Sequence, residues 1–290
     1  AEVRGSIPLG STTAQARRRP SEACAHRAKR GRRSAATTDN VGFACRAARN
    51  GMLATMSFVA TSPAMPDQQP IPAATLVLFR DRPTGPPELL MVERAKAMAF
   101  AGGAMVFPGG RIDPDDELLA QLHPGHPDAA ARIAAVRETL EEAGLAVGIA
   151  PPPSPEQVAE LRGRLHDGVA FGRALEEAGL RLDLDALTPF ARWLPAHRHA
   201  RIFDTLFFLA RAPDTGIATV DETENVRLVW TSACGMLDEV DAGRAAAIFP
   251  TRRNLERLAR FGSFEDAVAD ARAHPIHPVT PFLETRDGVE

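Results

Sequence analysis

The sequence has few cysteines and no long apolar run, and both shortages limit what the protein can be. No stretch of about 18 consecutive apolar residues occurs, so a membrane-spanning helix is not expected. The three cysteines, Cys24, Cys45 and Cys234, form neither a C-x-x-C pair nor any metal-ligand spacing. Such an odd and sparse set suggests a reducing compartment and no disulfide framework. With 44% hydrophobic and 24% charged residues, the 290-residue chain otherwise has the composition of a soluble globular protein.

Acidic residues are scarce near the beginning of the sequence. Residues 1–51 hold eleven Lys or Arg against three acids, a net charge of +8, whereas the rest of the chain carries −11. This first segment shows neither helical nor strand periodicity, and its composition cannot bury a core. We therefore expect residues 1–68 to form a disordered basic extension.

The basic extension has three competing explanations. An Arg-rich, acid-poor composition is typical of a transit peptide, which would make the protein mitochondrial. A nucleic-acid-binding arm usually interleaves aromatic residues, and Phe43 is the only one among the first 51 residues. The third explanation, which we prefer, is an over-extended translation start, with Met52, Met56 or Met65 as the natural first residue. We accordingly expect a cytoplasmic protein.

An ordered pattern begins near residue 71. Two apolar runs rich in β-forming residues, 72–80 and 88–94, flank a Pro/Gly cluster and predict a hairpin with a long loop. A third run, 104–107, ends at Pro108-Gly109-Gly110. Two glycines after a proline allow a positive φ and a close approach of the backbone, so we expect a turn there.

A helix is predicted between Asp128, a suitable N-cap, and Gly144, a suitable C′ residue. Its apolar residues form one stripe that can pack on a sheet, whereas Glu138, Glu141 and Glu142 fall on the opposite side. Like charges three or four residues apart destabilise a helix by about 0.2–0.5 kcal/mol per pair, and the last turn is the negative end of the helix dipole. A divalent cation would relieve both problems, and oxygen ligands favour Mg²⁺ or Mn²⁺.

The acidic pattern of this helix occurs twice in the chain. Leu140-Glu141-Glu142-Ala143-Gly144-Leu145 recurs as Leu175-Glu176-Glu177-Ala178-Gly179-Leu180. The second copy has Arg173 where the first has Glu138, and no Pro-Gly-Gly turn precedes it. We therefore expect the second copy to be a surface helix that ends at a glycine cap. A solvated acidic face is the simpler alternative for the first copy as well.

The first copy lies in a segment that resembles the Nudix box, G-x5-E-x7-R-E-U-x-E-E-x-G-U, in which U is a bulky apolar residue. Residues 137–145, Arg-Glu-Thr-Leu-Glu-Glu-Ala-Gly-Leu, match its second half, and Gly110 matches its opening glycine. Asp116 stands where the first glutamate belongs, with Glu117 one place late, and thirteen extra residues precede Arg137. Whether Asp116 or Glu117 joins the metal site is left open.

A box split by an insertion is similar to that of the Nudix branch that cleaves coenzyme A and acyl-CoA. That branch carries L-L-T-x-R-[SA]-x3-R-x3-G-x3-F-P-G-G upstream, and residues 90–110 fit this spacing. Met91 and Val92 replace Leu and Thr, and Ala99 replaces the second arginine, which removes a cationic group that could contact an anion.

The order of elements predicts the architecture. Mixed strands flanked by helices predict an α/β/α sandwich, and the resemblance implies a Nudix hydrolase domain over residues 69–262. We expect a helical insertion at about 151–190 and a C-terminal helix with an irregular tail at 263–290.

The resemblance implies metal-dependent hydrolysis of a pyrophosphate linkage in a nucleoside diphosphate derivative, with CoA or acyl-CoA as the favoured substrate. An ADP-ribose or dinucleotide pyrophosphatase and a non-catalytic nucleotide-binding domain are the alternatives. The expected partner is this small molecule, with no stable nucleic-acid complex and no membrane association. A homodimer is left open.

The resemblance also assigns roles to residues of the box. Glu138, Glu141 and Glu142 would bind Mg²⁺ or Mn²⁺. On the helical wheel, Arg137 lies about 40° from Glu141, so it could orient a carboxylate, although a surface ion pair is an equal alternative.

Residues outside the helix complete the expected site. Gly109 and Gly110 would let the loop approach the helix and the substrate, and Arg94 is a candidate for binding phosphate. Nudix enzymes often take a catalytic base from a loop outside the box, and Asp221-Glu222-Thr223-Glu224 could supply it here. We prefer Glu222 over Glu224 for that role.

Overall fold

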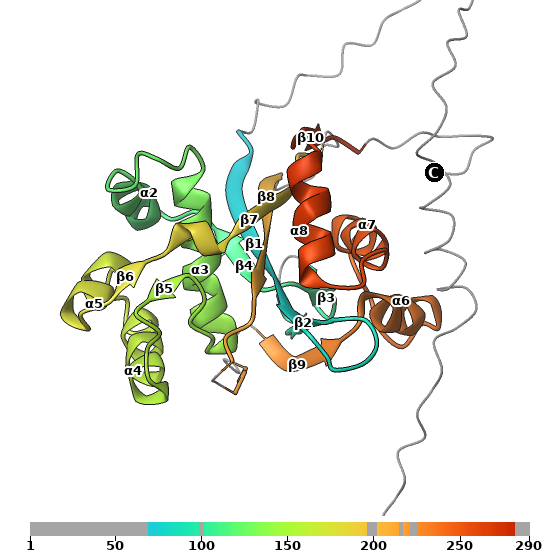
Figure 1. Ribbon diagram of the computed structural model, residues 1–290, viewed down its shortest axis with the longest axis horizontal. Helices are drawn as coiled ribbons and strands as arrows, with labels where there is room; N and C mark the ends of the chain where they lie inside the picture. The colour runs from blue at the N-terminus through green and yellow to red at the C-terminus, as the bar shows by residue number, and fades with distance from the viewer. Residues whose placement is uncertain (1–68, 99–100, 196–201, 215–216, 221–224, 282–290) are drawn as a thin grey trace, which may run out of the picture.

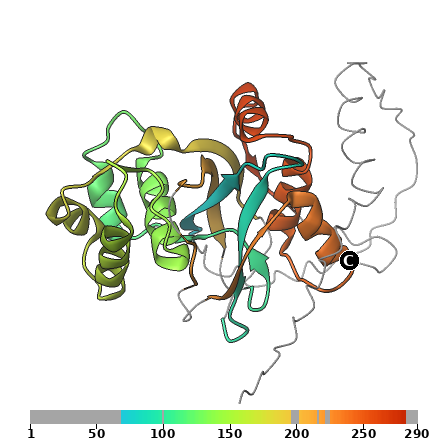
Figure 2. The ribbon, with the colours of Figure 1, turned by 60° about the horizontal axis from the view of Figure 1, so that its bottom comes forward.

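The structure, a computed structural model, describes residues 69–98, 101–195, 202–214, 217–220 and 225–281. A mixed β-sheet lies between two groups of helices, with α2 to α5 on one side and α6 to α8 on the other (Figure 1). The same separation is visible after a rotation by 60° (Figure 2). Within the described residues, no helix is long and apolar enough to cross a membrane.

The sheet has the strand order β10-β7-β8-β1-β2-β3, with β4 added beside β1 and β9 beside β2. Its strands are β1 (Ile71–Arg80), β2 (Glu88–Arg94), β3 (Met105–Val106), β4 (Gly109–Arg111), β7 (Thr188–Trp193), β8 (Phe203–Arg211), β9 (Asn225–Thr231) and β10 (Pro278–Val279). A separate antiparallel pair consists of β5 (Ile149–Ala150) and β6 (Arg181–Leu182). The helices are α2 (Pro114–Ala120), α3 (Ala129–Ala143), α4 (Pro155–His166), α5 (Phe171–Glu177), α6 (Ala233–Asp241), α7 (Phe249–Leu258) and α8 (Phe264–Ala273), with a short 3-10 helix at Leu184–Ala186.

Strand β1 organises the sheet. It runs parallel to β8 along most of its length, and its other edge is shared by two antiparallel strands. β4 pairs with the first half of β1 and β2 pairs with its last two residues. The β1–β2 hairpin and the mixed sheet are therefore confirmed. The expectation of a simple turn at Gly109 and Gly110 is wrong, because both glycines pair with β1 as part of β4.

The side chains of β1 alternate between two hydrophobic cores, as the pleat of a strand requires. Leu76 and Leu78 pack in the core that α3, α4 and α5 cover, whereas Val77 and Phe79 pack in the core that α6, α7 and α8 cover. Because both faces of the strand are buried, its sequence is a continuous apolar run rather than an alternating one. The fold is thus an α/β/α sandwich with a mixed sheet, as expected.

Helix α3 has the predicted boundaries. Asp128 is its N-cap residue, and Gly144 ends it in the left-handed conformation with φ of 64°. The Asp128 side chain does not cap the backbone but accepts a hydrogen bond from Arg132 Nε at 2.9 Å. A further helix, α2, precedes α3 in a region for which the sequence predicted no element.

The second copy of the acidic pattern lies at the end of α5, on the surface. Its Glu177 is exposed and pairs with Arg164 and Arg173. Gly179 follows in the left-handed conformation, with φ of 68°. The expectation of a surface helix that ends at a glycine is confirmed.

Helix α7 begins at Phe249 with Ile248 as its N-cap, and Thr251 lies buried in its first turn. Cys234 is disulfide-bonded, whereas no disulfide framework was expected.

Candidate active site

Strand β4 and the second half of α3 bring the twin glycines against the acidic turn. The backbone N–H of Gly109 donates a hydrogen bond to Glu142 Oε2 at 3.0 Å. A Cβ atom on Gly110 would lie 2.3 Å from Glu138 Oε1, and a Cβ on Gly109 would lie 2.3 Å from the carbonyl oxygen of Ala74. Both positions therefore require glycine, Gly109 to pair with β1 and Gly110 to leave room for the Glu138 carboxylate.

Glu142 is the most buried carboxylate of the acidic turn, with an exposed fraction of 3%. Burial raises its pKa to about 8, and repulsion from Glu138 adds to the increase. The side chain of Asn225, the N–H of Gly109 and the charge of Arg94 act in the opposite direction on this pKa. Glu142 thus faces the sheet edge rather than an open acidic surface, which corrects the expectation of three carboxylates facing away from the sheet.

Arg137 lies at the centre of a network of carboxylates. Its Nε and Nη2 atoms donate to Asp116 at 3.1 and 2.8 Å, and its Nη1 atom donates to Glu138 at 3.0 Å and to Glu141 at 3.1 Å. Nη2 also donates to the carbonyl oxygen of Arg111 at 3.0 Å. Burial alone would lower the pKa of Arg137, but the contacts with Asp116, Glu138 and Glu141 raise it above its usual value. Arg137 is therefore not the surface ion pair of the simpler alternative.

Asp116 has an exposed fraction of 1%, and both of its oxygens bind Arg137. One of them also accepts a hydrogen bond from the backbone N–H of Asp113, which closes a capping box at the start of α2. Helix α2 thereby places Asp116 in contact with Arg137 of α3, although thirteen extra residues separate the two parts of the box. Glu117 is exposed. Of the two candidate acids, only Asp116 reaches the network, where it contacts the arginine.

The carboxylate of Glu141 lies between Arg137 and the end of α4. Burial raises its pKa, and the charges of Arg137 and His166 counteract that increase. Thr139, which replaces the apolar residue of the box, is fully buried and donates to the carbonyl oxygen of Ala135 at 2.7 Å. A hydroxyl is tolerated there because its hydrogen bond is satisfied within the helix.

The donor set of this turn matches the ligands that Mg²⁺ and Mn²⁺ prefer, which are carboxylate oxygens. Burial and, to a lesser extent, repulsion from Glu138 raise the pKa of Glu142, and a divalent cation would offset that repulsion. In the described ranges of the chain, however, no group of three His, Cys, Asp or Glu side chains has the geometry of a preformed metal site. Glu138 and Glu141 instead turn toward Arg137.

Arg94 and Asn225 are paired residues of β2 and β9, next to a register shift between Glu93 and Arg94. Both influence the charge of Glu142, so the predicted phosphate-binding arginine lies beside the acidic turn. Glu222 and Glu224, the candidates for the base, lie outside the described residues.

Sequence reasoning missed two residues of the site, Asn225 and the α4 residue Arg162. Asn225 is fully buried, but only the pairing of β9 with β2 brings it to Glu142, and no spacing in the sequence indicates that pairing. Arg162 reaches the last turn of α3 from helix α4. A buried polar residue at the start of a predicted strand is the only signal that could have indicated Asn225.

Comparison with known proteins gives related enzymes and one well-covered structure. The chain is similar to the crystal structure of a Nudix hydrolase from Alicyclobacillus acidocaldarius, with 31% identity and a TM-score of 0.62 over 70% of this chain and 97% of that one. It is also 26% identical to acyl-coenzyme A diphosphatase NUDT19 of Gallus gallus and 27% identical to that of Homo sapiens. These two matches cover 62% and 63% of this chain.

The match to the curated relatives is partial, since it spans 63% and 65% of their lengths. No family model matches the chain. The bacterial structure, in contrast, is matched over nearly its whole length at an identity that goes beyond a shared fold. Together with the acidic turn on α3 and the glycines of β4, these findings establish that the chain belongs to the Nudix hydrolase superfamily of enzymes.

Proposed function

We propose that the protein hydrolyses a pyrophosphate linkage in a nucleoside diphosphate derivative, with the last turn of α3 as its metal-binding centre. The observation that carries the proposal is the burial of the Glu142 carboxylate beside Glu138. This carboxylate is buried, accepts a hydrogen bond from the N–H of Gly109 at 3.0 Å and is repelled by Glu138, so a divalent cation beside it would stabilise its ionised form. Perturbed carboxylates of this kind cluster at functional sites.

Glu138, Glu141 and Glu142 would hold Mg²⁺ or Mn²⁺. When bound, such a cation neutralises charge on the diphosphate oxygens and makes the attacking water more acidic. Binding would draw Glu138 away from Arg137 and replace this largely buried ion pair by contact with the cation. Arg137 would keep its two contacts with Asp116 and so continue to orient Glu141.

The remaining proposed residues bind substrate and transfer the proton. Arg94 would contact a phosphate, and Gly109 and Gly110 would let the backbone approach the substrate closely. The oxygen of water attacks one phosphorus, the bond from that phosphorus to the bridging oxygen breaks, and Glu222 accepts the proton of the water. Catalysis of this class of reaction consists mostly of positioning and charge stabilisation.

CoA or acyl-CoA is the substrate that we favour. Two observations support it, the similarity to two acyl-coenzyme A diphosphatases and the fit of residues 90–110 to the upstream pattern of that branch. The loss of the second arginine at Ala99 keeps ADP-ribose and dinucleotides as the second choice. A domain that only binds nucleotides is disfavoured because all three glutamates of the helix are present.

The proposal is tested by a panel of diphosphates that contains CoA, an acyl-CoA, ADP-ribose and a dinucleotide, each with and without Mg²⁺ or Mn²⁺. We expect metal-dependent release of phosphopantetheine from CoA. Glu142→Gln should abolish turnover and keep the fold. The matched control is Glu177→Gln, because it changes the corresponding glutamate of the exposed second copy and should leave turnover unchanged.

Three outcomes would count against parts of the proposal. Turnover of ADP-ribose but not of CoA would show that the alternative substrate class, ADP-ribose or a dinucleotide, is the correct one. Tight nucleotide binding without any turnover would favour the non-catalytic alternative. Wild-type rates in Glu142→Gln would remove the site assignment.

A further inference from the structure

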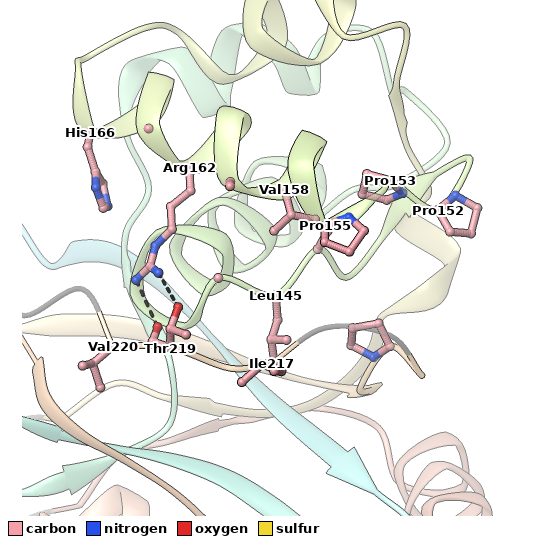
Figure 3. Close-up of a pocket in the computed structure, with 15 residues that line it drawn as sticks. Leu145, Pro152, Pro153, Pro155, Val158, Arg162, His166, Ile217, Thr219 and Val220 are labelled. Carbon is pink, nitrogen blue, oxygen red and sulfur yellow. Dashed lines mark hydrogen bonds between the residues drawn. The ribbon is translucent and has the colours of Figure 1, made fainter.

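The inserted helix α4 contacts the acidic turn of α3 through one side chain. Arg162 Nε donates a hydrogen bond to the carbonyl oxygen of Glu141 at 2.8 Å, and its Nη2 atom lies 3.4 Å from the carbonyl oxygen of Glu142. The other edge of the guanidinium binds Thr219, with Nη1 to Oγ1 at 2.7 Å and Nη2 to the carbonyl oxygen at 3.1 Å (Figure 3). Arg162 thus bridges α3 and the segment 217–220.

These contacts satisfy the backbone at the point where helices leave it unsatisfied. The last carbonyl groups of an α-helix have no partner within the helix, and they form the negative end of its dipole. Arg162 donates to two of them, at Glu141 and Glu142, and the N–H of Thr219 donates to the third, at Ala143, at 3.0 Å. The turn that carries two of the proposed metal ligands is therefore held from outside the helix.

The glycine that ends α3 makes room for this arrangement. A Cβ atom on Gly144 would lie 3.1 Å from Arg162 Nη1 and 3.1 Å from Thr219 Oγ1. Gly144 is thus needed both for its left-handed conformation and for the close approach of the guanidinium. The second copy of the pattern shows the contrast, because nothing lies within 4 Å of a Cβ placed on Gly179.

We propose that Arg162 is a positioning residue of the active site. It holds the last turn of α3 in register, so that Glu141 and Glu142 keep the geometry that metal binding needs. This inference rests on the proposed function of that turn. Arg162 contacts the backbone of both residues, so its role differs from that of Arg137, which binds the carboxylate of Glu141.

The surroundings of Arg162 allow a chemical test. Its side chain lines a cavity of about 430 Å³ between α4, the segment 144–146, Pro213 and the segment 217–220, whose walls include Leu145, Val158 and Ile217 (Figure 3). Removing the guanidinium leaves space at the wall of this cavity, into which a small cation can diffuse from solvent. A soluble guanidinium ion can therefore take the place of the missing group.

The experiment compares Arg162→Met, Arg162→Lys and a control on the same helix, Arg164→Met, which removes an ion pair with Glu177 of α5. We expect kcat of Arg162→Met to fall by about tenfold to a hundredfold, with a higher Mg²⁺ activation constant and little change in KM, because misplaced catalytic groups cost factors of this order. Arg162→Lys should recover only part of the loss, since an ammonium cannot reproduce the fork of contacts. Millimolar methylguanidinium should raise kcat of Arg162→Met and leave the control unchanged.

Hydrogen exchange separates this inference from the proposed function. Exchange of the amides of Gly144 and Thr219 should speed up in Arg162→Met and slow again with methylguanidinium, whichever substrate the enzyme cleaves. If the wild type hydrolyses no diphosphate, the proposed function fails. The exchange data still test the Arg162 clamp, by which we mean the contacts of Arg162 with Glu141, Glu142 and Thr219. If Arg162→Met does not fold, Thr219→Val removes one contact of the clamp and should lower kcat by a smaller factor. Unchanged exchange and unchanged kcat in the variant that folds would overturn the inference.

Discussion

Two glutamates that lie in the same six-residue pattern have pKa values shifted in opposite directions. Glu142 and Glu177 both occupy the second acidic position of Leu-Glu-Glu-Ala-Gly-Leu. Burial raises the pKa of Glu142, whereas contacts with Arg173 and Arg164 lower the pKa of exposed Glu177. The difference comes from what packs against each residue, namely the backbone of β4 in one case and two surface arginines in the other. The pattern therefore indicated a candidate, and only its surroundings distinguish the two copies.

The raised pKa of Glu142 predicts how stability depends on pH in metal-free buffer. Glu142 keeps its proton to about pH 8 in the folded protein, whereas its ordinary pKa is 4.5. The native state binds the extra proton between these values, so its contribution to stability is full below the lower value and is lost as the pH rises to the upper one. The slope for a single group is about 1.4 kcal/mol per pH unit.

Glu142→Gln should therefore be more stable than the wild type near pH 9 and similar to it near pH 4, while being inactive. Urea denaturation of both proteins across this range, without divalent metal, measures the difference. Added Mg²⁺ should stabilise the wild type at alkaline pH and have little effect on the variant. Parallel stability curves for the two proteins would show that Glu142 does not titrate in this way.

At the scale of elements, the predictions that succeeded used local signals. The hairpin of β1 and β2 follows from two apolar runs around a Pro/Gly cluster, and α3 follows from its apolar stripe and its terminal residues. Strand β4 was mistaken for a turn because its pairing with residues 73–75 of β1 depends on a contact that is distant in sequence. Helix α2 was missed because it spans the point at which the insertion interrupts the box, where the pattern gives no guidance.

The two glycines of β4 predict two different failures when each is replaced by alanine. A Cβ on Gly109 would meet backbone atoms of β1, the carbonyl oxygen of Ala74 at 2.3 Å and Cα of Thr75 at 2.7 Å. The strands must separate, so Gly109→Ala should lower stability by about 1–3 kcal/mol, the cost of overpacking. A Cβ on Gly110 would meet only the end of the flexible Glu138 side chain, at 2.3 Å from Oε1.

Gly110→Ala should therefore fold with near-normal stability and lose most of its metal-dependent activity, since Glu138 is displaced. Thermal unfolding and Mg²⁺ titration of activity on both variants separate the two effects. The account of β4 would be wrong if Gly110→Ala were the unstable variant and Gly109→Ala the stable but inactive one.

At the scale of the whole molecule, the two faces of the sheet differ in what they carry. The face covered by α3 to α5 carries the acidic turn, the arginine network and the Arg162 clamp. The opposite face, covered by α6 to α8, is a core in which α8 packs on β7 and β8. The family, the mixed sheet and the acidic helix could be predicted from the sequence, because motif and periodicity express them locally. The partners of Glu142 and the contact of Arg162 with the end of α3 could not be predicted, because they depend on strands and helices that meet only in the folded chain.

The binding of a divalent cation at the last turn of α3 is the central claim, and a crystal of the wild type soaked in Mn²⁺ tests it most directly. Anomalous scattering locates manganese without reference to turnover or substrate. We predict a manganese peak coordinated by carboxylate oxygens of Glu138, Glu141 and Glu142, with the ion pair between Glu138 and Arg137 broken. A well-ordered acidic turn with no manganese, and with Glu138 still bound to Arg137, would contradict the account.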